Sequence, residues 1–296
     1  MRFSRLRGAV RMAYDDPTTL VSTDWLGQHL KDPDLRILDA SWYLPDMGRD
    51  GKAEYDEAHI PGARWVSAAE VSDTSAELPN TVPPMEKFVS RMRRLGVGDG
   101  HQVVVYDGAG LFSAARLWWL FRLMGKTGVA VLDGGFAKWQ AEGRAVEDMP
   151  PAMRDRHITV TRQNHLVRDV TQVAAASKLG DHQIVDARAP ERFAGLAPEP
   201  RKGLRAGHIP GSVNLPYKTL LNADGTFKAP DALRAAFTAA GVDLARPVIT
   251  TCGSGVTAAV LSLGLEVLGH RDHGLYDGSW AEWGMYNDLK VATGEN

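Results

Sequence analysis

The feature that most constrains the fold is an internal repeat. The segment "EAHIPGARWV" around His59 returns as "RAGHIPGSVNL" around His208, and three more pairs keep the same order at a separation of roughly 145 residues. These pairs are "RILDA" with "QIVDA", "VVVYDGAGLFSAA" with "VITTCGSGVTAA", and "VLDGGFAKW" with "LYDGSWAEW". A nearly constant separation over four segments indicates a duplication. We therefore expect two related domains.

The length of 296 residues accommodates two ordinary domains. We expect an N-terminal extension at 1–19, a first domain at 20–145, a linker at 146–165 and a second domain at 166–292. The linker contains Pro150 and Pro151, and consecutive prolines suppress helix and favour an extended path.

Short, uninterrupted apolar runs alternate with longer segments of helical periodicity in both copies. Continuous apolar strands between helices predict an α/β fold in which each domain has a parallel β-sheet flanked by helices on both faces. The expected strands are 36–38, 103–106, 129–132, 184–185, 248–251 and 275–276, and the expected helices are 86–95, 112–124, 170–179, 232–240 and 256–268.

Composition excludes several classes of function. A net charge of −2 argues against a nucleic-acid or membrane surface built from excess positive charge, and no apolar run is long enough to span a bilayer. The single cysteine excludes an intrachain disulfide framework and a multi-thiolate metal site, and it suits a reducing compartment. The nine histidines show no paired-ligand spacing, and no glycine-rich nucleotide fingerprint is present. We expect no metal and no cofactor.

The first twelve residues, "MRFSRLRGAVRM", carry four arginines and no acid. They fit either an over-extended start, with Met12 near the true beginning, or a short mitochondrial transit peptide. We expect a cytoplasmic protein, with a mitochondrial location as the alternative.

The only cysteine, Cys252, stands between an expected strand and an expected helix, in "TTCGSGVTAA". In open α/β sheets, ligands bind where strands end and helices begin. Glycines in this loop bring bare amides close to its centre, and a helix N-terminus adds unpaired N–H groups and a partial positive charge. The loop could therefore stabilise a nucleophilic thiolate, although an isolated cysteine is often only a small buried hydrophobe.

The tandem copies with "HIPG" and "DG–W" segments and the single "CGSGVT" loop resemble the rhodanese superfamily of sulfurtransferases over nearly the whole chain. The loop is similar to that of the 3-mercaptopyruvate sulfurtransferases. This resemblance implies that Cys252 takes up sulfane sulfur as a persulfide and passes it to a thiol acceptor, such as thioredoxin or a low-molecular-weight thiol, or to cyanide. Asp107 occupies the place of the cysteine in the first copy, so that copy is expected to be catalytically silent.

The resemblance also implies a substrate-binding set. Arg192 and Arg201 match the two arginines that bind mercaptopyruvate in that family, and a guanidinium fork suits a carboxylate. Thiosulfate sulfurtransferases typically carry two basic residues where this chain has Gly253 and Ser254, and a neutral rim disfavours the thiosulfate dianion. The remaining expected binding positions are the loop residues Gly253, Gly255, Val256 and Thr257.

A Ser–His–Asp relay has been proposed in such enzymes, and its matching residues here are Ser254, His59 and Asp50. This assignment requires the two domains to face each other across a cleft. His59 has a structural alternative, because "HIPG" forms an expected turn in both copies. Arg188 is expected to pair with a nearby acid.

Three other functions compete with mercaptopyruvate sulfur transfer. Thiosulfate:cyanide sulfurtransferase differs only in the donor. A rhodanese-fold phosphatase would need an arginine after the cysteine with five residues between them, where this chain has Ala258. A non-catalytic binding module would not need Cys252 or Arg192.

Overall fold

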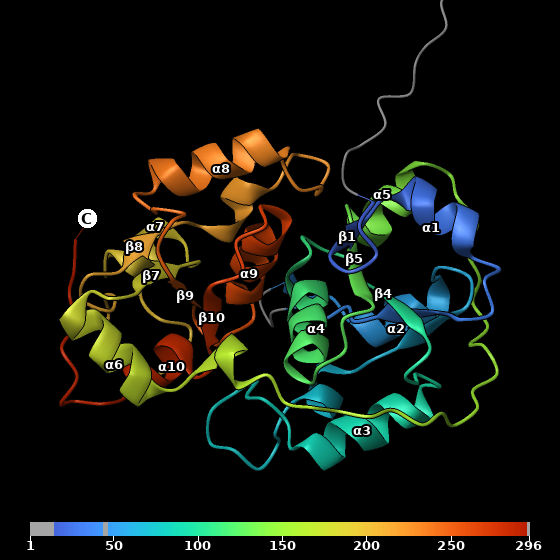
Figure 1. Ribbon diagram of the computed structural model, residues 1–296, viewed down its shortest axis with the longest axis horizontal. Coiled ribbons are helices and arrows are strands. Elements are labelled where there is room, and N and C mark those ends of the chain that lie inside the picture. Colours follow the sequence, from blue (N-terminus) through green and yellow to red (C-terminus); the bar gives the residue numbers. More distant parts are fainter. Residues whose placement is uncertain (1–14, 44–46, 295–296) are drawn as a thin grey trace, which may run out of the picture.

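The computed structural model describes residues 15–43 and 47–294, and the arginine-rich first twelve residues lie outside this part of the chain. Two five-stranded parallel sheets are present, with the orders β1-β5-β4-β2-β3 and β6-β10-β9-β7-β8. The two sheets have the same topology, which confirms the predicted duplication and the α/β class. Figure 1 shows them side by side, with their helices around them.

The first sheet is built between Leu20 and Leu132. Its strands are β1 (Leu20–Val21), β2 (Leu35–Asp39), β3 (Ala63–Trp65), β4 (Gln102–Tyr106) and β5 (Val129–Leu132). Its helices are α1 (Thr23–His29), α2 (Gly51–Glu57), the 3₁₀ helix η2 (Ala68–Val71), α3 (Met85–Arg94), α4 (Phe112–Leu123) and α5 (Gly135–Ala141).

The second sheet repeats this order between Val167 and Tyr276. Its strands are β6 (Val167–Arg168), β7 (Gln183–Asp186), β8 (Val213–Asn214), β9 (Val248–Thr251) and β10 (His273–Tyr276). Its helices are η3 (Asn164–Leu166), α6 (Val170–Leu179), α7 (Pro190–Phe193), η4 (Tyr217–Leu220), α8 (Pro230–Ala239), α9 (Ala258–Val267) and α10 (Ser279–Trp283). Every predicted strand and helix is present, whereas the four edge strands are two or three residues long and leave too short a pattern to predict.

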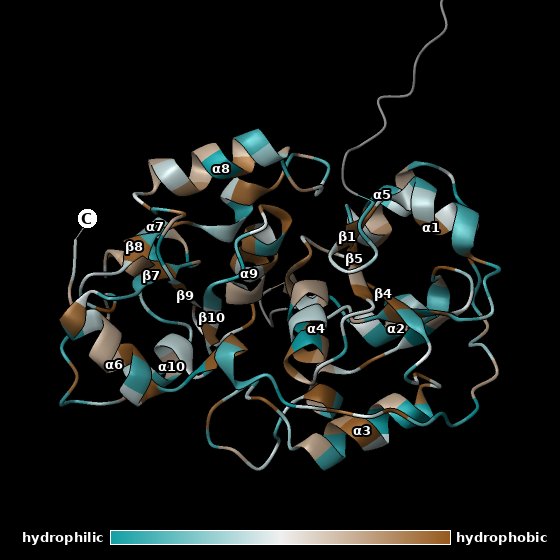
Figure 2. Ribbon diagram, in the orientation of Figure 1, coloured by the Kyte–Doolittle hydropathy of each residue, from teal (hydrophilic) through white to brown (hydrophobic). Residues whose placement is uncertain are grey.

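Local sequence explains where the helices begin and end. Asp169 and Gln172 form a reciprocal capping box at the start of α6, and Gly180 ends it in the left-handed conformation. Pro230 occupies the first turn of α8, where the missing N–H costs nothing. Apolar and polar residues alternate along α3, as Figure 2 shows, because one face of this helix packs on the core.

One apolar cluster joins the two domains. It contains Phe88 and Trp119 from the first domain together with Leu220, Phe237 and Leu261 from the second. Helices α4 and α9 pack against each other at its centre (Figure 1). Two smaller clusters cover the outer faces of the two sheets. Each sheet is therefore covered on both faces, and the centre of the contact between the domains is apolar.

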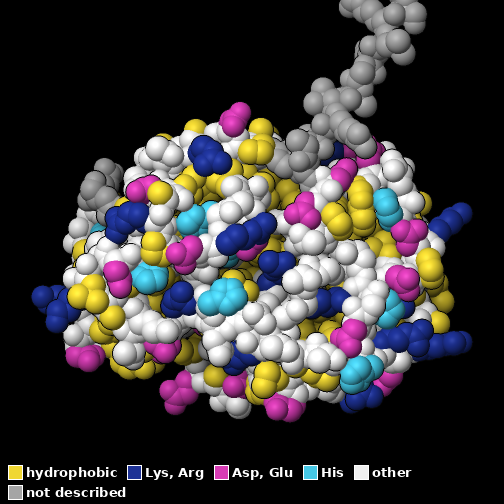
Figure 3. Space-filling view, viewed as in Figure 1, with side chains coloured by type: hydrophobic (Ala, Val, Ile, Leu, Met, Phe, Trp, Pro, Cys, Tyr) yellow, Lys and Arg dark blue, Asp and Glu magenta, His cyan; other side chains and the backbone are white. Residues whose placement is uncertain are grey.

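No helix in the described part of the chain is both long and apolar enough to cross a membrane. Over the same residues, His, Cys, Asp and Glu side chains form no group of three or more that could hold a metal ion. Figure 3 shows acidic and basic side chains interspersed over one face of the molecule.

Candidate active site

Cys252 directly follows β9, the central strand of the second sheet, and its side chain is buried. The backbone carbonyls of Cys252 and Gly253 accept hydrogen bonds from the N–H groups of Trp280 and Ala281, both at 2.9 Å. The N–H of Cys252 donates to the Ser279 hydroxyl at 3.2 Å. The start of α10 thus fixes the first residues of the loop that carries the cysteine.

The N–H groups of the cysteine loop have no partner in the described part of the chain. Among the described residues, none accepts a hydrogen bond from the N–H of Gly253, Ser254, Gly255, Val256 or Thr257. Gly255 has a φ of +76°, and a side chain there would meet the Asp277 carbonyl oxygen at 2.8 Å. Glycine is therefore required for the loop to curl in front of α9. A ring of unpaired amides at a helix N-terminus favours an anion such as a thiolate or a carboxylate.

Arg192 lies against this ring. It lies in the last turn of the short helix α7, and its Nη2 is 2.9 Å from the point where a Gly253 side chain would begin. Glu199 forms an ion pair with Arg192 and another with Arg188, at 2.9 Å between Nη1 and Oε1. Arg188 also pairs with Asp186 at 2.7 Å. This buried chain of charges holds the Arg192 guanidinium in place, and Arg188 pairs with nearby acids as predicted.

Arg201 lies near enough to Arg192 and Cys252 for their charges to act on it. Burial lowers the pKa of the Arg201 guanidinium, the charge of Arg192 lowers it further, and Cys252 raises it. The two arginines predicted from the resemblance therefore stand on the cysteine side of the second domain. Two neighbouring cations there suit an anionic ligand that carries two oxygens to bind.

Ser254 faces the first domain. Its hydroxyl oxygen accepts a hydrogen bond from Nδ2 of Asn80 at 3.1 Å. Arg116 crosses from α4 and donates to the carbonyl oxygens of Asn80 and Gly255, at 2.5 Å and 3.2 Å, and to Asp277 at 2.7 Å. The first domain thus contacts the cysteine loop directly, and the predicted cleft between the domains is present.

The predicted relay does not form. The His59 ring is fully buried, its Nδ1 contacts the Tyr55 carbonyl oxygen at 2.7 Å, and it stacks on the Tyr55 ring. Asp50 is the N-cap of α2 and accepts from the N–H groups of Lys52 and Ala53. Neither residue contacts Ser254 in the described structure.

The second copy explains the role of the histidine. His208 contacts the Phe193 carbonyl oxygen at 2.8 Å and stacks on the Phe193 ring, and its backbone pairs with Ala292. The backbone of His59 pairs in the same way with Glu147. The "HIPG" histidines therefore hold the end of each domain in place, in the copy with Asp107 and in the copy with Cys252 alike.

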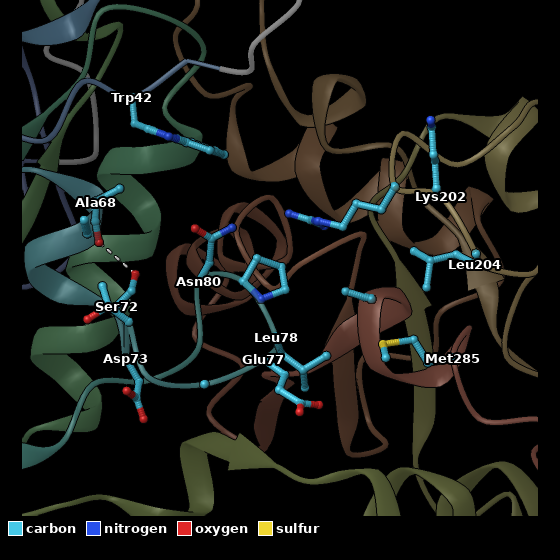
Figure 4. Close-up of a pocket in the computed structure, with 17 residues that line it drawn as sticks. Trp42, Ala68, Ser72, Asp73, Glu77, Leu78, Asn80, Lys202, Leu204 and Met285 are labelled. Carbon is cyan, nitrogen blue, oxygen red and sulfur yellow. Dashed lines mark hydrogen bonds between the residues drawn. The ribbon is translucent and has the colours of Figure 1, made fainter.

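A pocket of about 660 Å³ opens between the domains beside the cysteine loop. Figure 4 shows Trp42 and Asn80 of the first domain opposite Lys202, Leu204 and Met285 of the second. Arg201 also lines it, whereas the buried Cys252 is not among its lining residues. This space connects Arg201 with solvent, and Asn80, which contacts Ser254 of the cysteine loop, forms part of its wall.

Four residues of the site are not evident from the sequence: Asn80, Arg116, Glu199 and Ser279. Glu199 had a detectable signal, because it lies between Arg192 and Arg201 and a carboxylate among arginines is a natural partner. Asn80 and Ser279 both have a positive φ, of 58° and 50°, which no local pattern reveals. Arg116 interrupts a mostly apolar helix, and no local pattern shows that it reaches the other domain.

The comparisons with known proteins agree with this geometry. The family model for the rhodanese-like domain matches twice, at residues 22–142 and 169–286. The chain is 41% identical to a 3-mercaptopyruvate sulfurtransferase of Escherichia coli, over 93% of this chain and 98% of that one. It is also 41% identical to a thiosulfate sulfurtransferase of Rattus norvegicus, over 89% and 91% of the two chains.

Among solved structures, the crystal structure of SseA from Escherichia coli, a 3-mercaptopyruvate sulfotransferase, superposes with a TM-score of 0.82. The two are 39% identical, and the match covers 89% of this chain and 99% of that one. Two matched domains, the shared sheet topology and the relatives of similar length lead to one conclusion: this chain belongs to the rhodanese family.

Proposed function

We propose that the protein is a sulfurtransferase that moves sulfane sulfur from 3-mercaptopyruvate to an acceptor through a persulfide on Cys252. The catalytic copy is the domain at 166–292, and the copy at 20–145 supplies the opposite wall of the cleft. The observation that carries the proposal is the ring of free N–H groups around Cys252 with Arg192 placed over Gly253.

The reaction has two steps. The Cys252 thiolate attacks the sulfur of mercaptopyruvate, so that an S–S bond forms and the C–S bond breaks. The electron pair of the C–S bond passes into the enolate of pyruvate, which takes a proton from water or with help from Ser254. The persulfide then gives its outer sulfur to the acceptor, and the thiolate is restored.

The loop favours this donor over thiosulfate. Overall identity does not separate them, since relatives named for either donor are equally similar. Gly253 and Ser254 leave the rim of the loop without a charge, whereas the guanidinium groups of Arg192 and Arg201 fit one carboxylate and a keto oxygen. Gly255, Val256 and Thr257 would direct their N–H groups at the bound donor. Thiosulfate is the alternative donor.

The acceptor belongs to the second step. A thiol acceptor, either thioredoxin or a low-molecular-weight thiol, would take sulfur in the cell, and cyanide would take it in an assay. We place the protein in the cytoplasm, or in mitochondria if the arginine-rich first residues act as a transit peptide.

Mass spectrometry tests the intermediate. Donor without acceptor should add one sulfur, about 32 Da, to the peptide that contains Cys252. The Cys252→Ser variant should show no such addition. An unmodified Cys252 in folded wild-type protein, after treatment with either donor, would contradict the mechanism.

Comparison of kcat/KM for the two donors tests the donor. A higher value for mercaptopyruvate supports the proposal, and a higher value for thiosulfate replaces it with the alternative.

A further inference from the structure

Asn80 reaches from the silent domain to the catalytic loop of the other domain. It lies in the segment between η2 and α3, and its Nδ2 donates to the Ser254 hydroxyl at 3.1 Å. Its backbone carbonyl is held by the buried guanidinium of Arg116 at 2.5 Å. Figure 4 shows its side chain directed into the pocket between the domains. Arg116 thus holds the backbone of Asn80 in place, and the side-chain amide of Asn80 points at Ser254.

The backbone at Asn80 has a conformation that favours glycine. Its φ is +58°, and asparagine is one of the few residues with a side chain that adopts this region readily. In the second copy the equivalent position is Gly225, with a φ of +79°. Since α3 and α8 begin at equivalent residues, the two positions correspond directly. The chain therefore has a side chain at this turn only where the turn faces the cysteine loop.

The partner of Asn80 differs between the copies in the same way. Ser254 lies two residues after Cys252, and the residue two positions after Asp107 is Ala109. The pair Asn80 and Ser254 thus occurs around the thiol, whereas the silent copy has Gly225 and Ala109 in the corresponding places. A hydrogen-bonded pair that is present around the thiol and absent from the silent loop indicates a role in the reaction.

We propose that Asn80 is a positioning residue that fixes the direction of the Ser254 hydroxyl. Because the Ser254 oxygen accepts the amide hydrogen of Asn80, its own hydrogen is free to point into the cleft. There it donates a hydrogen bond to the keto oxygen of the donor. This inference rests on the proposed function, since it requires a donor with a keto group.

The hydrogen bond acts when the C–S bond breaks. Negative charge then develops on the oxygen of the enolate, and a donor already directed at that oxygen stabilises it without reorganisation. No proton needs to leave Ser254. Thiosulfate has no keto oxygen and forms no enolate, so its reaction should depend less on this pair.

The test is the variant Asn80→Gly, which copies the residue of the other domain. Glycine adopts a positive φ without strain, so the turn should persist while the amide is removed. With mercaptopyruvate we expect kcat to fall about 10-fold and KM to change less, because the hydrogen bond strengthens in the transition state. With thiosulfate we expect a smaller fall. Thermal unfolding should show that the variant remains folded.

A double-mutant cycle with Ser254→Ala separates positioning from a general structural effect. If Asn80 acts through Ser254, then Asn80→Gly should lower the mercaptopyruvate rate no further once Ser254 is alanine. Asn80→Asp provides a second variant. Its carboxylate accepts the Ser254 hydrogen instead of donating, so it should reduce kcat at least as much as glycine does.

Three results would overturn the role of Asn80. They are a wild-type kcat in Asn80→Gly, an equal loss for the two donors, and a further loss in the Ser254→Ala background. The activity of the wild-type protein distinguishes failure of the Asn80 proposal from failure of the proposed function. If it does not turn over mercaptopyruvate at all, both proposals fail, whereas normal wild-type turnover with any of the three results removes only Asn80.

Discussion

The loops that follow β4 and β9 occupy equivalent places at the centres of the two sheets, yet they hold different groups. In the first domain the Asp107 carboxylate fills the loop. It accepts hydrogen bonds from the N–H groups of Ala109, Leu111 and Ala114 at 3.0, 3.1 and 2.9 Å, and from the Ser113 hydroxyl at 3.1 Å. In the second domain the corresponding loop amides have no acceptor among the described residues.

The difference shows what the fold contributes and what one residue contributes. Both loops form an anion-binding ring at a helix N-terminus. Burial raises the pKa of Asp107, and the backbone N–H groups oppose this by favouring its charged form. The first copy satisfies the N–H groups of its loop with the Asp107 carboxylate. In the second copy the corresponding N–H groups have no acceptor among the described residues, and under the proposed function they would face sulfur and the charge that develops on the substrate.

The largest expected effect comes from making the two loops alike. Cys252→Asp places in the second ring the group that fills the first. We expect sulfur transfer to fall to the uncatalysed background, because the nucleophile is lost. We also expect the melting temperature to stay at or above the wild-type value, because the carboxylate finds free N–H groups. Steady-state pyruvate release and thermal unfolding measure the two effects.

Cys252→Ala is the control for this variant. It should be equally inactive. It should be less stable than Cys252→Asp, because alanine offers the loop N–H groups no acceptor. If the aspartate variant proves less stable than the alanine variant, the two rings are not equivalent.

An intermediate effect is expected from the arginines. Arg49 in the first domain pairs with Glu54 at 2.7 Å and donates to the Gly108 carbonyl oxygen at 3.3 Å, much as Arg192 pairs with Glu199 beside Gly253. Arg192→Lys removes the planar fork but keeps the charge, so kcat/KM for mercaptopyruvate should fall about 10- to 100-fold. The loss for thiosulfate should be smaller.

Arg49→Lys is the matched variant in the silent domain. It should change kcat/KM by less than about 3-fold, because an exposed ion pair contributes little and no substrate lies against it. Similar losses in the two lysine variants would show that the clamp acts through stability rather than through substrate binding.

The smallest effect concerns the domain interface. Asp133 accepts a hydrogen bond from the Phe227 N–H of the other domain at 2.7 Å, and burial raises its pKa from 3.8 to about 7. The unfolded chain loses this proton at a lower pH than the folded chain does. Stability from this group is therefore complete below about pH 4 and is lost as the pH rises to about 7.

Asp133→Asn removes this dependence while keeping an acceptor for Phe227. We expect its melting temperature to exceed that of the wild type by about 3–8 °C at pH 8 and to match it near pH 4. Asp277→Asn is the comparison, because Asp277 pairs with the buried guanidinium of Arg116. That variant should be less stable than the wild type. A constant offset of Asp133→Asn at all pH values would contradict the titration of Asp133.

The repeat and the apolar runs were sufficient to predict the two sheets, their central strands and the place of Cys252. Those features depend on local periodicity. Where an apolar run ends, the strand ends, and Cys252 comes directly after such a run. The recurrence of "HIPG" in both copies already indicated a structural alternative for His59, whereas the role of Asp50 as the N-cap of α2 depends on where that helix begins. Asn80 could not be predicted, since its role depends on a positive φ and on how the two domains pack. Comparison of Asn80 with Gly225 in an aligned repeat is the signal that could have drawn attention to it.

The two domains also exchange contacts in pairs. Asp133 of the first accepts from the Phe227 N–H of the second, and Asp277 of the second accepts from the Val82 N–H of the first at 2.9 Å. Such reciprocity is the mark of an isologous interface, in which one surface patch meets its own copy. The molecule is thus arranged as a homodimer encoded in one polypeptide. One copy carries the cysteine, and Asn80 and Arg116 of the other copy contact the loop that holds it.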